Sequence, residues 1–288
     1  RTILMLEHQK KNYLLRNNVQ IPCVGFGTWQ IEDGKTVSTA VEGAIAAGYR
    51  HIDTAAAYRN ETGVGEGIRA AGIARESLFV TSKLWNDVRG YEATLQAFGE
   101  SLKRLNMEYL DLYLIHWPRP VAFRDTYELA NSETWRAFEH LLQEGYVRAI
   151  GVSNFLCNHL EALLKTAQVA PMVNQIEFHP GWLQPETVSF CQAHQIQIEA
   201  WSPLGSGKLL SDETLNTLAQ KYQKSCAQLC LRWGLQKQVL PLPKSVTPAR
   251  IAENLKVFDF EISEQDMAII DGLACVGRTG SDPENAKF

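Results

Sequence analysis

The stretch Leu110-Asp111-Leu112-Tyr113-Leu114-Ile115 is a short, mostly apolar run that ends abruptly at His116. A strand that is covered on both faces has this pattern, whereas a strand with one solvated face alternates apolar and polar residues. Just before it, Tyr91–Leu105 repeats apolar side chains every three or four positions, which is the spacing of a helix. A helix followed by a buried strand is the repeating unit of a parallel α/β sheet.

The same unit recurs along the chain. Short apolar runs are found at residues 23–27, 51–54, 78–82, 110–115, 148–152, 172–177, 196–201 and 239–243. Parallel neighbours need a crossover connection, which the amphipathic stretches between these runs supply. Eight units without a break in composition favour a closed (β/α)8 TIM barrel. The alternative is an open Rossmann-type sheet, but no glycine fingerprint follows the first run, and Gly63-Val64-Gly65-Glu66-Gly67 lies within a helical pattern.

A β-hairpin is predicted ahead of the first strand, and we expect it to close the bottom of the barrel. Its arms are residues 13–16 and 19–22, and Asn17-Asn18 forms a two-residue turn because asparagine tolerates positive φ. Residues 1–12 are expected to form a flexible extension. Barrels of this kind run to roughly 250 residues or more as one domain, so residues 1–288 are predicted to be a single domain.

The composition indicates an ordinary globular protein. Hydrophobic residues make up 45% of the chain and charged residues 21%, with a net charge of -4. This balance gives no reason to expect nucleic acid or an anionic membrane as a partner. No apolar run approaches the ~18 residues of a membrane span, and the first residues lack the apolar core of a signal peptide.

The six cysteines are scattered and form no C-x-x-C pair: Cys23, Cys157, Cys191, Cys226, Cys230 and Cys275. Cys226 and Cys230 are four residues apart on a predicted helix, where two thiolates can share a metal ion. No histidine or carboxylate pattern joins them, so we interpret them as packing thiols. A cytoplasmic protein with reduced thiols is therefore expected.

Four polar residues lie at or just beyond the ends of consecutive predicted strands: Asp53, Tyr58, Lys83 and His116. The active site of a (β/α)8 barrel collects at these carboxyl ends. Each residue alone has an ordinary structural explanation, such as a helix cap, packing or surface exposure. Together they supply a carboxylate, a phenol, an ammonium group and an imidazole.

These groups suit the reduction of a carbonyl, which needs a hydride donor and a source of a proton. A tyrosine hydroxyl, with a reference pKa of about 10, is a poor acid at neutral pH. We expect the Lys83 ammonium to lower the pKa of Tyr58, and Asp53 to keep that ammonium charged and oriented. His116 can donate a hydrogen bond to the carbonyl oxygen and polarise it.

The last predicted strand ends in a cluster of cations and hydroxyls. Lys244, Ser245, Thr247 and Arg250 lie around a strand end and a helix start, an arrangement that suits a phosphate group. The alternative is a capped, solvated helix start, because Thr247 followed by Pro248 is a typical N-cap signal.

Many segments of the chain resemble the aldo-keto reductase family, and the resemblance runs from about residue 13 to the end. The segments are Gly27-Thr28-Trp29, His51-Ile52-Asp53-Thr54-Ala55, Tyr58-Arg59-Asn60-Glu61, Thr81-Ser82-Lys83-Leu84-Trp85, residues 110–118, Gly151-Val152-Ser153-Asn154-Phe155, Asn174-Gln175-Ile176-Glu177, Ser202-Pro203-Leu204 and residues 243–254. The resemblance implies reduction of a small-molecule carbonyl by NADPH, with Tyr58 as the proton donor of a catalytic tetrad completed by Asp53, Lys83 and His116. The family binds its cofactor without a Rossmann motif.

The resemblance also implies a set of cofactor-binding residues, in which Ser153, Asn154 and Gln175 hold the nicotinamide carboxamide. The whole set is Gly27, Thr28, Trp29, Asp53, Ser153, Asn154, Gln175, Trp201, Ser202, Pro203, Leu204, Ser206, Lys208, Lys244, Ser245, Val246, Thr247, Arg250, Glu253 and Asn254. Trp201 is expected to stack on the nicotinamide. Many members of the family have tyrosine at this position, and the tryptophan here resembles the bacterial 2,5-diketo-D-gluconate reductases. With His116, three tryptophans at strand ends are expected to line the substrate site: Trp29, Trp85 and Trp117.

Two other functions are alternatives. A non-catalytic barrel that binds NADPH as a regulatory subunit is disfavoured by the intact tetrad. A metal-dependent hydrolase needs clustered ligands, and the remaining histidines His51 and His179 do not assemble a ligand set, so no metal is expected. The resemblance implies a monomer.

Overall fold

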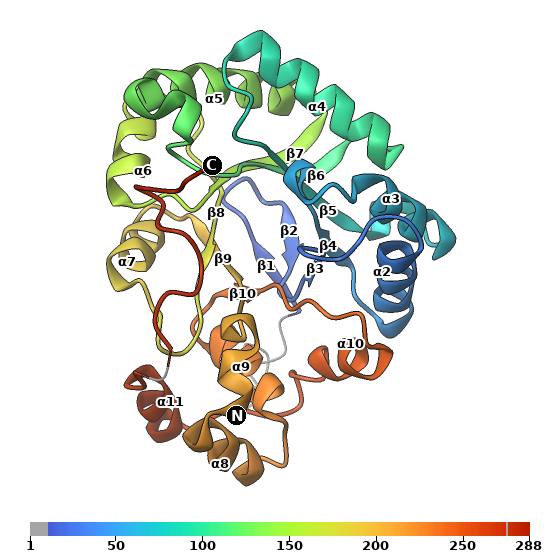
Figure 1. Cartoon of the computed structure of the whole chain (residues 1–288), viewed down its shortest axis with the longest axis vertical. Coiled ribbons are helices and arrows are strands. Elements are labelled where there is room, and N and C mark those ends of the chain that lie inside the picture. The colour runs from blue at the N-terminus through green and yellow to red at the C-terminus, as the bar shows by residue number, and fades with distance from the viewer. Residues whose placement is uncertain (1–10, 275) are drawn as a thin grey trace.

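The computed structural model describes residues 11–274 and 276–288, and its central element is the predicted barrel (Figure 1). Eight strands lie side by side in chain order and are all parallel. They are β3 (Phe26–Gly27), β4 (His51–Asp53), β5 (Phe79–Leu84), β6 (Leu110–Ile115), β7 (Val147–Ser153), β8 (Val173–Glu177), β9 (Gln197–Trp201) and β10 (Leu240–Pro241). Gly25 and Gly27 donate backbone hydrogen bonds to the carbonyl oxygens of Pro241 and Pro243, which joins the first strand to the last. The alternative of an open sheet was therefore wrong.

The first and last strands are shorter than the five residues predicted for each, for a local reason. Proline has no N–H, so Pro241 and Pro243 accept hydrogen bonds from the β3 side but return none. Leu242, between them, donates to the carbonyl oxygen of Ala200 in the other direction. The closing seam therefore carries only half of a regular set of hydrogen bonds.

Helices surround the strands in a ring (Figure 1). They are α2 (Lys35–Ala47), α3 (Glu61–Ala70), α4 (Tyr91–Leu105), α5 (Tyr127–Gln143), α6 (Cys157–Leu164), α7 (Pro185–Ala193), α8 (Glu213–Lys221), α9 (Cys226–Gln236), α10 (Pro248–Asn254) and α11 (Glu264–Asp271), with short 3-10 turns η1 (Ala56–Tyr58), η2 (Arg75–Ser77), η3 (Val121–Thr126) and η4 (Gly205–Ser211). The glycines that superficially resembled a nucleotide fingerprint lie in α3. A Cβ on Gly65 would lie 2.3 Å from the carbonyl oxygen of Leu105, so this glycine allows α3 to pack closely against the end of α4.

The hairpin is formed by β1 (Asn12–Leu14) and β2 (Gln20–Pro22) and closes the bottom of the barrel. The predicted two-residue turn was wrong: Leu15 bonds Val19, which leaves a three-residue loop. A primed turn needs positive φ at both central residues, and only Asn18 (φ 66) adopts it. The extension also ends earlier than predicted, because Asn12 lies in a strand; residues 1–10 lie outside the described residues.

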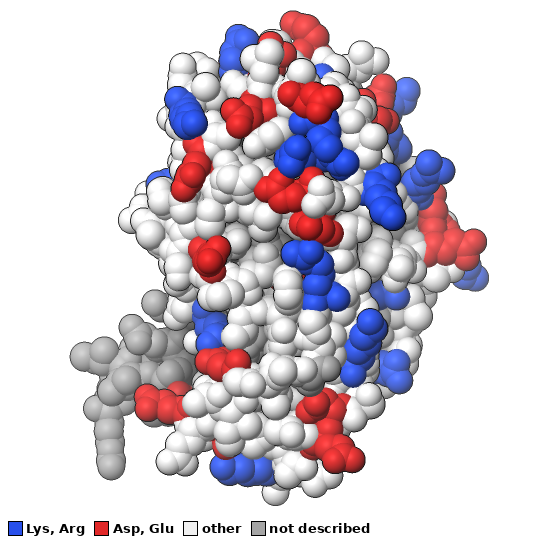
Figure 2. Space-filling model, turned by 60° about the vertical axis from the view of Figure 1, so that its left-hand side comes forward, with Lys and Arg blue, Asp and Glu red and all other residues white. Residues whose placement is uncertain are grey.

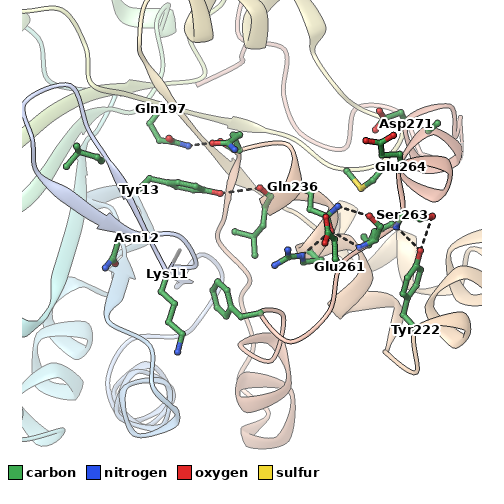
Figure 3. Close-up of a pocket in the computed structure, with 18 of the residues that line it drawn as sticks. Lys11, Asn12, Tyr13, Gln197, Tyr222, Gln236, Glu261, Ser263, Glu264 and Asp271 are labelled. Atoms are coloured by element: carbon green, nitrogen blue, oxygen red, sulfur yellow. Dashed lines mark hydrogen bonds between the residues drawn. The ribbon is translucent and has the colours of Figure 1, made fainter. Parts of the chain in front are cut away.

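The carbonyl oxygen of Pro22 lies 3.2 Å from Nδ1 of His51, the first residue of β4, which places the hairpin at the amino ends of the strands. A cavity of about 1400 Å³ lies at this end between the hairpin and α8, α9 and α11 (Figure 3). Polar side chains that line this cavity form hydrogen bonds with other groups of the chain. For example, Tyr13 donates to the carbonyl oxygen of Leu235 and Tyr222 donates to Asp266.

Side chains on the outer face of the strands pack against the helices. Tyr113 in β6 stacks on Phe138 in α5 at 4.8 Å between ring centroids and meets Phe98 of α4 edge-on at 5.0 Å. The barrel interior is different, because the buried side chains of Lys83, Gln175 and Glu199 are polar. Barrel interiors are normally filled by branched apolar residues, so this polar interior indicates a function.

On the face of the molecule shown in Figure 2, basic and acidic side chains are interspersed over a largely uncharged surface. Among the described helices, none combines the length and apolar character that crossing a membrane requires.

Candidate active site

A cleft of about 1100 Å³ opens at the carboxyl ends of the strands, the end opposite the hairpin. It is lined by 23 of the 25 residues that the sequence singled out as catalytic, cofactor-binding or substrate-binding; the two exceptions are Lys83 and Lys208. Lys83 is fully buried just behind the wall. Lys208 is exposed in η4 and does not line the cleft, although Ser206, Gly207 and Leu210 of the same turn do.

Asp53, Lys83 and Tyr58 form a hydrogen-bonded chain that ends in the cleft. The Lys83 ammonium donates to Asp53 Oδ1 at 2.7 Å, to the carbonyl oxygen of Thr54 at 3.0 Å and to the Tyr58 hydroxyl at 3.1 Å. Burial opposes the charge on Lys83, but Asp53 and Tyr58 outweigh it and hold the pKa of the ammonium above its usual value. Lys83 is therefore charged at neutral pH.

The pKa of Tyr58 differs from the prediction. Lys83 lowers this pKa as expected, but burial of the hydroxyl is the larger effect and raises the pKa above its ordinary value. The predicted net lowering was therefore wrong. Tyr58 keeps its proton at neutral pH, with a cation in place beside the oxygen.

The backbone around Tyr58 is fixed by a buried asparagine. Tyr58 ends the 3-10 turn η1, and Arg59 next to it takes a left-handed conformation (φ 54). Asn60 donates to the carbonyl oxygens of Thr28 and Ile31 at 2.8 and 3.0 Å and accepts from the Thr54 hydroxyl at 2.8 Å. These bonds tie the Tyr58 loop to the loop after β3, so the hydroxyl is held in one place.

His116, just beyond the end of β6, lies beside Tyr58, with 5.7 Å between the ring centroids. Burial, followed by the cations Lys83 and Arg89, holds the pKa of His116 well below its usual range. The imidazole is therefore neutral and can donate one N–H. Trp85 meets the His116 ring edge-on at 5.2 Å.

The middle of the cleft carries amide and hydroxyl groups around Trp201. Trp201 Nε1 donates to Asn154 Oδ1 at 2.8 Å. The Asn154 amide nitrogen donates to the His116 carbonyl oxygen at 3.0 Å, and Ser153 donates to the backbone of Gln175 at 2.8 Å. The Gln175 amide nitrogen donates to Asp53 Oδ2 at 2.8 Å. This part of the cleft offers a flat aromatic ring beside several hydrogen-bonding groups.

The far end of the cleft is basic. Lys244 and Arg250 line it, and in residues 11–274 and 276–288 neither takes part in an ion pair. Helix α10 begins after Thr247 with Pro248 at its first turn, as predicted, but the Thr247 side chain makes no capping bond. Ser245 instead accepts a bond from the Thr247 N–H at 3.0 Å. Two unpaired cations at the edge of a cleft suit a phosphate ligand.

Several residues that line the cleft were missed by sequence reasoning. Phe288 lies 5.1 Å from Trp117 and 5.7 Å from Trp85, between ring centroids, and completes an aromatic wall. Thr279 and Gly280 also line the cleft, and a Cβ on Gly280 would lie 2.2 Å from the Trp201 ring. The other missed residues are Gln30, Ala57, Gly207, Leu210, Ser225, Cys226, Ala227, Leu242, Pro243 and Ser281. No local pattern marks the chain near its C-terminus as part of this wall.

The C-terminal segment is fixed to the barrel by two carboxylates. Glu177, at the end of β8, accepts from Thr279 N and Oγ1 at 2.7 Å each and from Gly280 N at 2.9 Å. Glu284 pairs with Arg119 at 2.5 Å and accepts from Asn158 in α6 at 2.7 Å. In Figure 1 this segment, coloured red, runs past α7 and α6 to the C-terminus.

The histidines and cysteines left over from the sequence have structural partners. His51 faces Glu199 and His179 bonds Glu177. Cys226 donates to the carbonyl oxygen of Leu209, and both Cys226 and Cys230 are buried, in line with packing thiols. Cys275 lies outside the described residues. Across the described part of the chain, no group of three or more His, Cys, Asp or Glu side chains could hold a metal ion.

Comparisons with known proteins agree with this geometry. The model of the Aldo/keto reductase family matches residues 23–274. Glyoxal reductase of Bacillus subtilis is 50% identical over 279 residues, which cover 97% of this chain and 98% of that protein. Methylglyoxal reductase DkgA of Yersinia pestis is 44% identical over 266 residues, which cover 92% of this chain and 93% of that protein.

Two solved structures are similar in fold as well as in sequence. MGS-M4, an aldo-keto reductase enzyme from a Medee basin deep-sea metagenome library, has a TM-score of 0.91 and 42% identity, covering 96% of this chain and 100% of that chain. A mutant of Gox0644 in complex with NADPH has a TM-score of 0.86 and 41% identity, covering 96% of this chain and 98% of that chain. The similarity therefore extends over the whole barrel.

Proposed function

The chain belongs to the aldo/keto reductase family, and we propose that it reduces aldehydes and ketones to alcohols with NADPH, using Tyr58 as the proton donor. The observation that carries this proposal is the buried chain Asp53–Lys83–Tyr58, which ends in the cleft beside a neutral histidine. A buried ammonium ion held against a phenol has no role in a purely structural barrel core, where an apolar side chain would pack better.

The residues divide the chemistry in a simple way. When bound, NADPH supplies a hydride to the carbonyl carbon. Tyr58 gives its proton to the carbonyl oxygen, and the phenolate that remains is stabilised by the Lys83 ammonium 3.1 Å away. Asp53 keeps Lys83 charged and oriented. His116 donates its one N–H to the carbonyl oxygen and stabilises the negative charge that develops there.

The shape and charge of the cleft fit NADPH. Lys244 and Arg250 would hold the 2'-phosphate at the basic end. Ser153, Asn154 and Gln175 would hold the carboxamide beside the Trp201 ring, which would stack on the nicotinamide. The fit is supported by two cations that have no carboxylate partner among the described residues and by a cleft that joins them to Tyr58.

The substrate is proposed to be a small carbonyl compound. The aromatic wall of Trp85, Trp117 and Phe288 stands next to His116, and Trp29 at the rim is 47% exposed. Two relatives carry the names glyoxal reductase and methylglyoxal reductase. A panel of methylglyoxal, aromatic aldehydes and keto-sugars with NADPH should give the highest kcat/KM for small aldehydes. Absence of turnover with every member would favour the non-catalytic NADPH-binding alternative.

The proton donor is tested by Tyr58→Phe, which removes one hydroxyl. The fold and NADPH affinity should be retained, while turnover falls by ~10²–10⁴-fold, the usual contribution of a general acid. The measurement is kcat beside a fluorescence titration with NADPH. Near-normal turnover in a variant that still binds NADPH would overturn the assignment.

Cofactor preference is tested by Arg250→Ala. Charge-assisted hydrogen bonds to a phosphate contribute about 1.5–3 kcal/mol each, so NADPH affinity should fall roughly 10- to 100-fold. NADH lacks the 2'-phosphate, so its affinity should change little. Equal weakening of both cofactors, measured by fluorescence quenching, would instead assign Arg250 to the stability of α10.

We further propose a single-domain, monomeric enzyme of the cytoplasm. The family model spans most of the chain, and no disulfide joins any of the described cysteines. Size-exclusion chromatography with light scattering should give the mass of one chain.

A further inference from the structure

A buried polar network lies behind the proposed active site, inside the barrel. His51 in β4, Gln175 in β8 and Glu199 in β9 are at most 1% exposed. The Gln175 amide nitrogen donates to Asp53 Oδ2 at 2.8 Å and to Glu199 Oε1 at 3.3 Å. His51 Nε2 lies 3.6 Å from the other Glu199 oxygen, Oε2. The hydrogen-bonded chain that begins at Tyr58 therefore continues inward as far as Glu199.

The partners of these groups set where the protons lie. Asp53 is acceptor-only as a carboxylate, so the nitrogen end of the Gln175 amide must face it. His51 Nδ1 lies 3.2 Å from the carbonyl oxygen of Pro22, another acceptor, so this nitrogen carries a hydrogen. Burial lowers the pKa of His51 to about 4, so the neutral ring has its lone pair on Nε2. A lone pair of Nε2 therefore faces Glu199 Oε2 across 3.6 Å, a contact that favours a protonated carboxyl group over an anion.

The surroundings of Glu199 place that proton on the carboxyl group. Burial and then the charge of Asp53 raise the pKa of Glu199 to about 8, against smaller opposing effects of the Gln175 hydrogen bond and Lys83. The other titratable groups that face this region are His51 and Tyr58. Lys83 is already balanced by Asp53, so a second anion here would be uncompensated.

We propose that Glu199 is a positioning residue: as a neutral acid it accepts one hydrogen of the Gln175 amide and turns the amide oxygen toward the cleft to receive the cofactor carboxamide. This inference rests on the proposed NADPH site. Both amide hydrogens of Gln175 are used by Asp53 and Glu199, so the oxygen is the group left for a ligand. Glu199 Oε2 lies 3.6 Å from His51 Nε2, beyond hydrogen-bond distance, so the bond from Gln175 is the one that links the Glu199 carboxyl group to the cleft.

Two variants separate this role from a structural or a charged one. Glu199→Gln keeps an oxygen that accepts from Gln175 and gains an N–H that can donate to His51, so it imitates the protonated acid. Its affinity for NADPH at pH 7 should stay within about threefold of the wild type. Glu199→Leu removes the acceptor, and NADPH affinity should fall roughly 5- to 10-fold, the effect of one lost neutral hydrogen bond.

The pH dependence gives a readout that packing alone would not change. Ionisation of Glu199 as the pH rises through about 8 adds a negative charge beneath the nicotinamide site, so the wild type should gain affinity for NADP+ relative to NADPH. In Glu199→Gln this ratio should not change with pH. If the glutamine variant is as impaired as the leucine variant, or if its ratio titrates like the wild type, the proposal is overturned.

Infrared spectroscopy tests the proton without cofactor or turnover. The difference spectrum of wild type minus Glu199→Gln at pH 6 should contain the carbonyl band of a protonated carboxylic acid, and this band should disappear above the pKa of Glu199. Its absence at pH 6 would overturn the inference even if the enzyme reduces aldehydes. Its presence in a protein that neither binds NADPH nor reduces a carbonyl would instead overturn the proposed function. The infrared measurement also tests whether Glu199 is protonated if the leucine variant fails to fold.

Discussion

Glu177 at the end of β8 and Glu199 in β9 are both buried, and each lies beside a histidine whose Nδ1 contacts a proline carbonyl oxygen. The two pairs differ in the other donors that reach the carboxyl group. Glu177 accepts from His179 at 2.7 Å and from three donors of Thr279 and Gly280. Glu199 accepts one bond from Gln175 at 3.3 Å.

The donors decide the charge. Burial by itself raises the pKa of Glu177, but the hydrogen bonds outweigh burial and hold the pKa below its usual value. For Glu199, burial and the charge of Asp53 outweigh the opposing effects of Gln175 and Lys83, and the pKa rises to about 8. The two glutamates therefore differ in charge. Glu177 anchors the C-terminal segment as an anion at the rim, whereas Glu199 is a neutral acid in the barrel interior. Burial alone does not predict which state is found.

The largest expected effect comes from removing the cation of the interior. Lys83→Met keeps the bulk of the side chain but leaves Asp53 and Glu199 without a positive neighbour. Carbonyl reduction should fall by ~10²-fold or more, and alcohol oxidation, which needs the Tyr58 phenolate, at least as much. The measurement is kcat against pH in both directions.

A surface lysine provides the control for this prediction. Lys221→Met removes an ammonium whose side chain is 60% exposed, and it should leave both pH profiles unchanged. An unchanged oxidation profile in Lys83→Met would show that the electrostatic account of the interior is wrong.

A smaller effect, on stability, is expected at the rim. Glu177→Gln turns an amide N–H toward donors of Thr279 and Gly280, so the free energy of unfolding should fall by about 2–4 kcal/mol. The pKa of Glu177 is lowered in the folded state, so its stabilisation is present above the unfolded pKa of about 4.3 and is lost as pH falls through the folded pKa. Urea unfolding at pH 7 and below pH 4 should show a difference between variant and wild type that narrows in acid. The matched control is Glu186→Gln, at an exposed position. An equal loss of unfolding free energy in both variants would show that Glu177 does not anchor the C-terminal segment as an anion.

The smallest effect is the slope of stability with pH at Glu199. Its folded pKa is raised, so the folded protein holds a proton that the unfolded chain releases above about pH 4.3, and this contribution to stability is lost as pH rises toward 8. The Glu199→Gln variant lacks this titration. Its free energy of unfolding, relative to the wild type, should therefore increase between pH 5 and pH 8 by up to about 1.4 kcal/mol per pH unit. If the unfolding free energy of the variant relative to the wild type stays constant or decreases over this range, Glu199 is an anion in the folded protein, like Glu177.

The sequence by itself determined the order and type of the main elements. Buried strands and amphipathic helices are local periodic patterns, and eight of them in alternation are sufficient for the barrel. Strand ends also marked Asp53, Lys83 and His116, because in a parallel barrel all carboxyl ends meet at one rim. The turn of the hairpin was less predictable, since Asn17 and Asn18 both tolerate positive φ and only one adopts it.

Only the tertiary structure decided the contacts between distant segments. Phe288 reaches Trp117 from the far end of the chain, and no spacing in the sequence encodes that approach. The pKa of Tyr58 was predicted in the wrong direction because the sequence shows that a lysine is near but not that the desolvation of the hydroxyl outweighs it. The desolvation of a titratable side chain, and the number of donors that reach it, depend on every group that surrounds it in space. For that reason the sequence identified the titratable residues, whereas the fold set their charges.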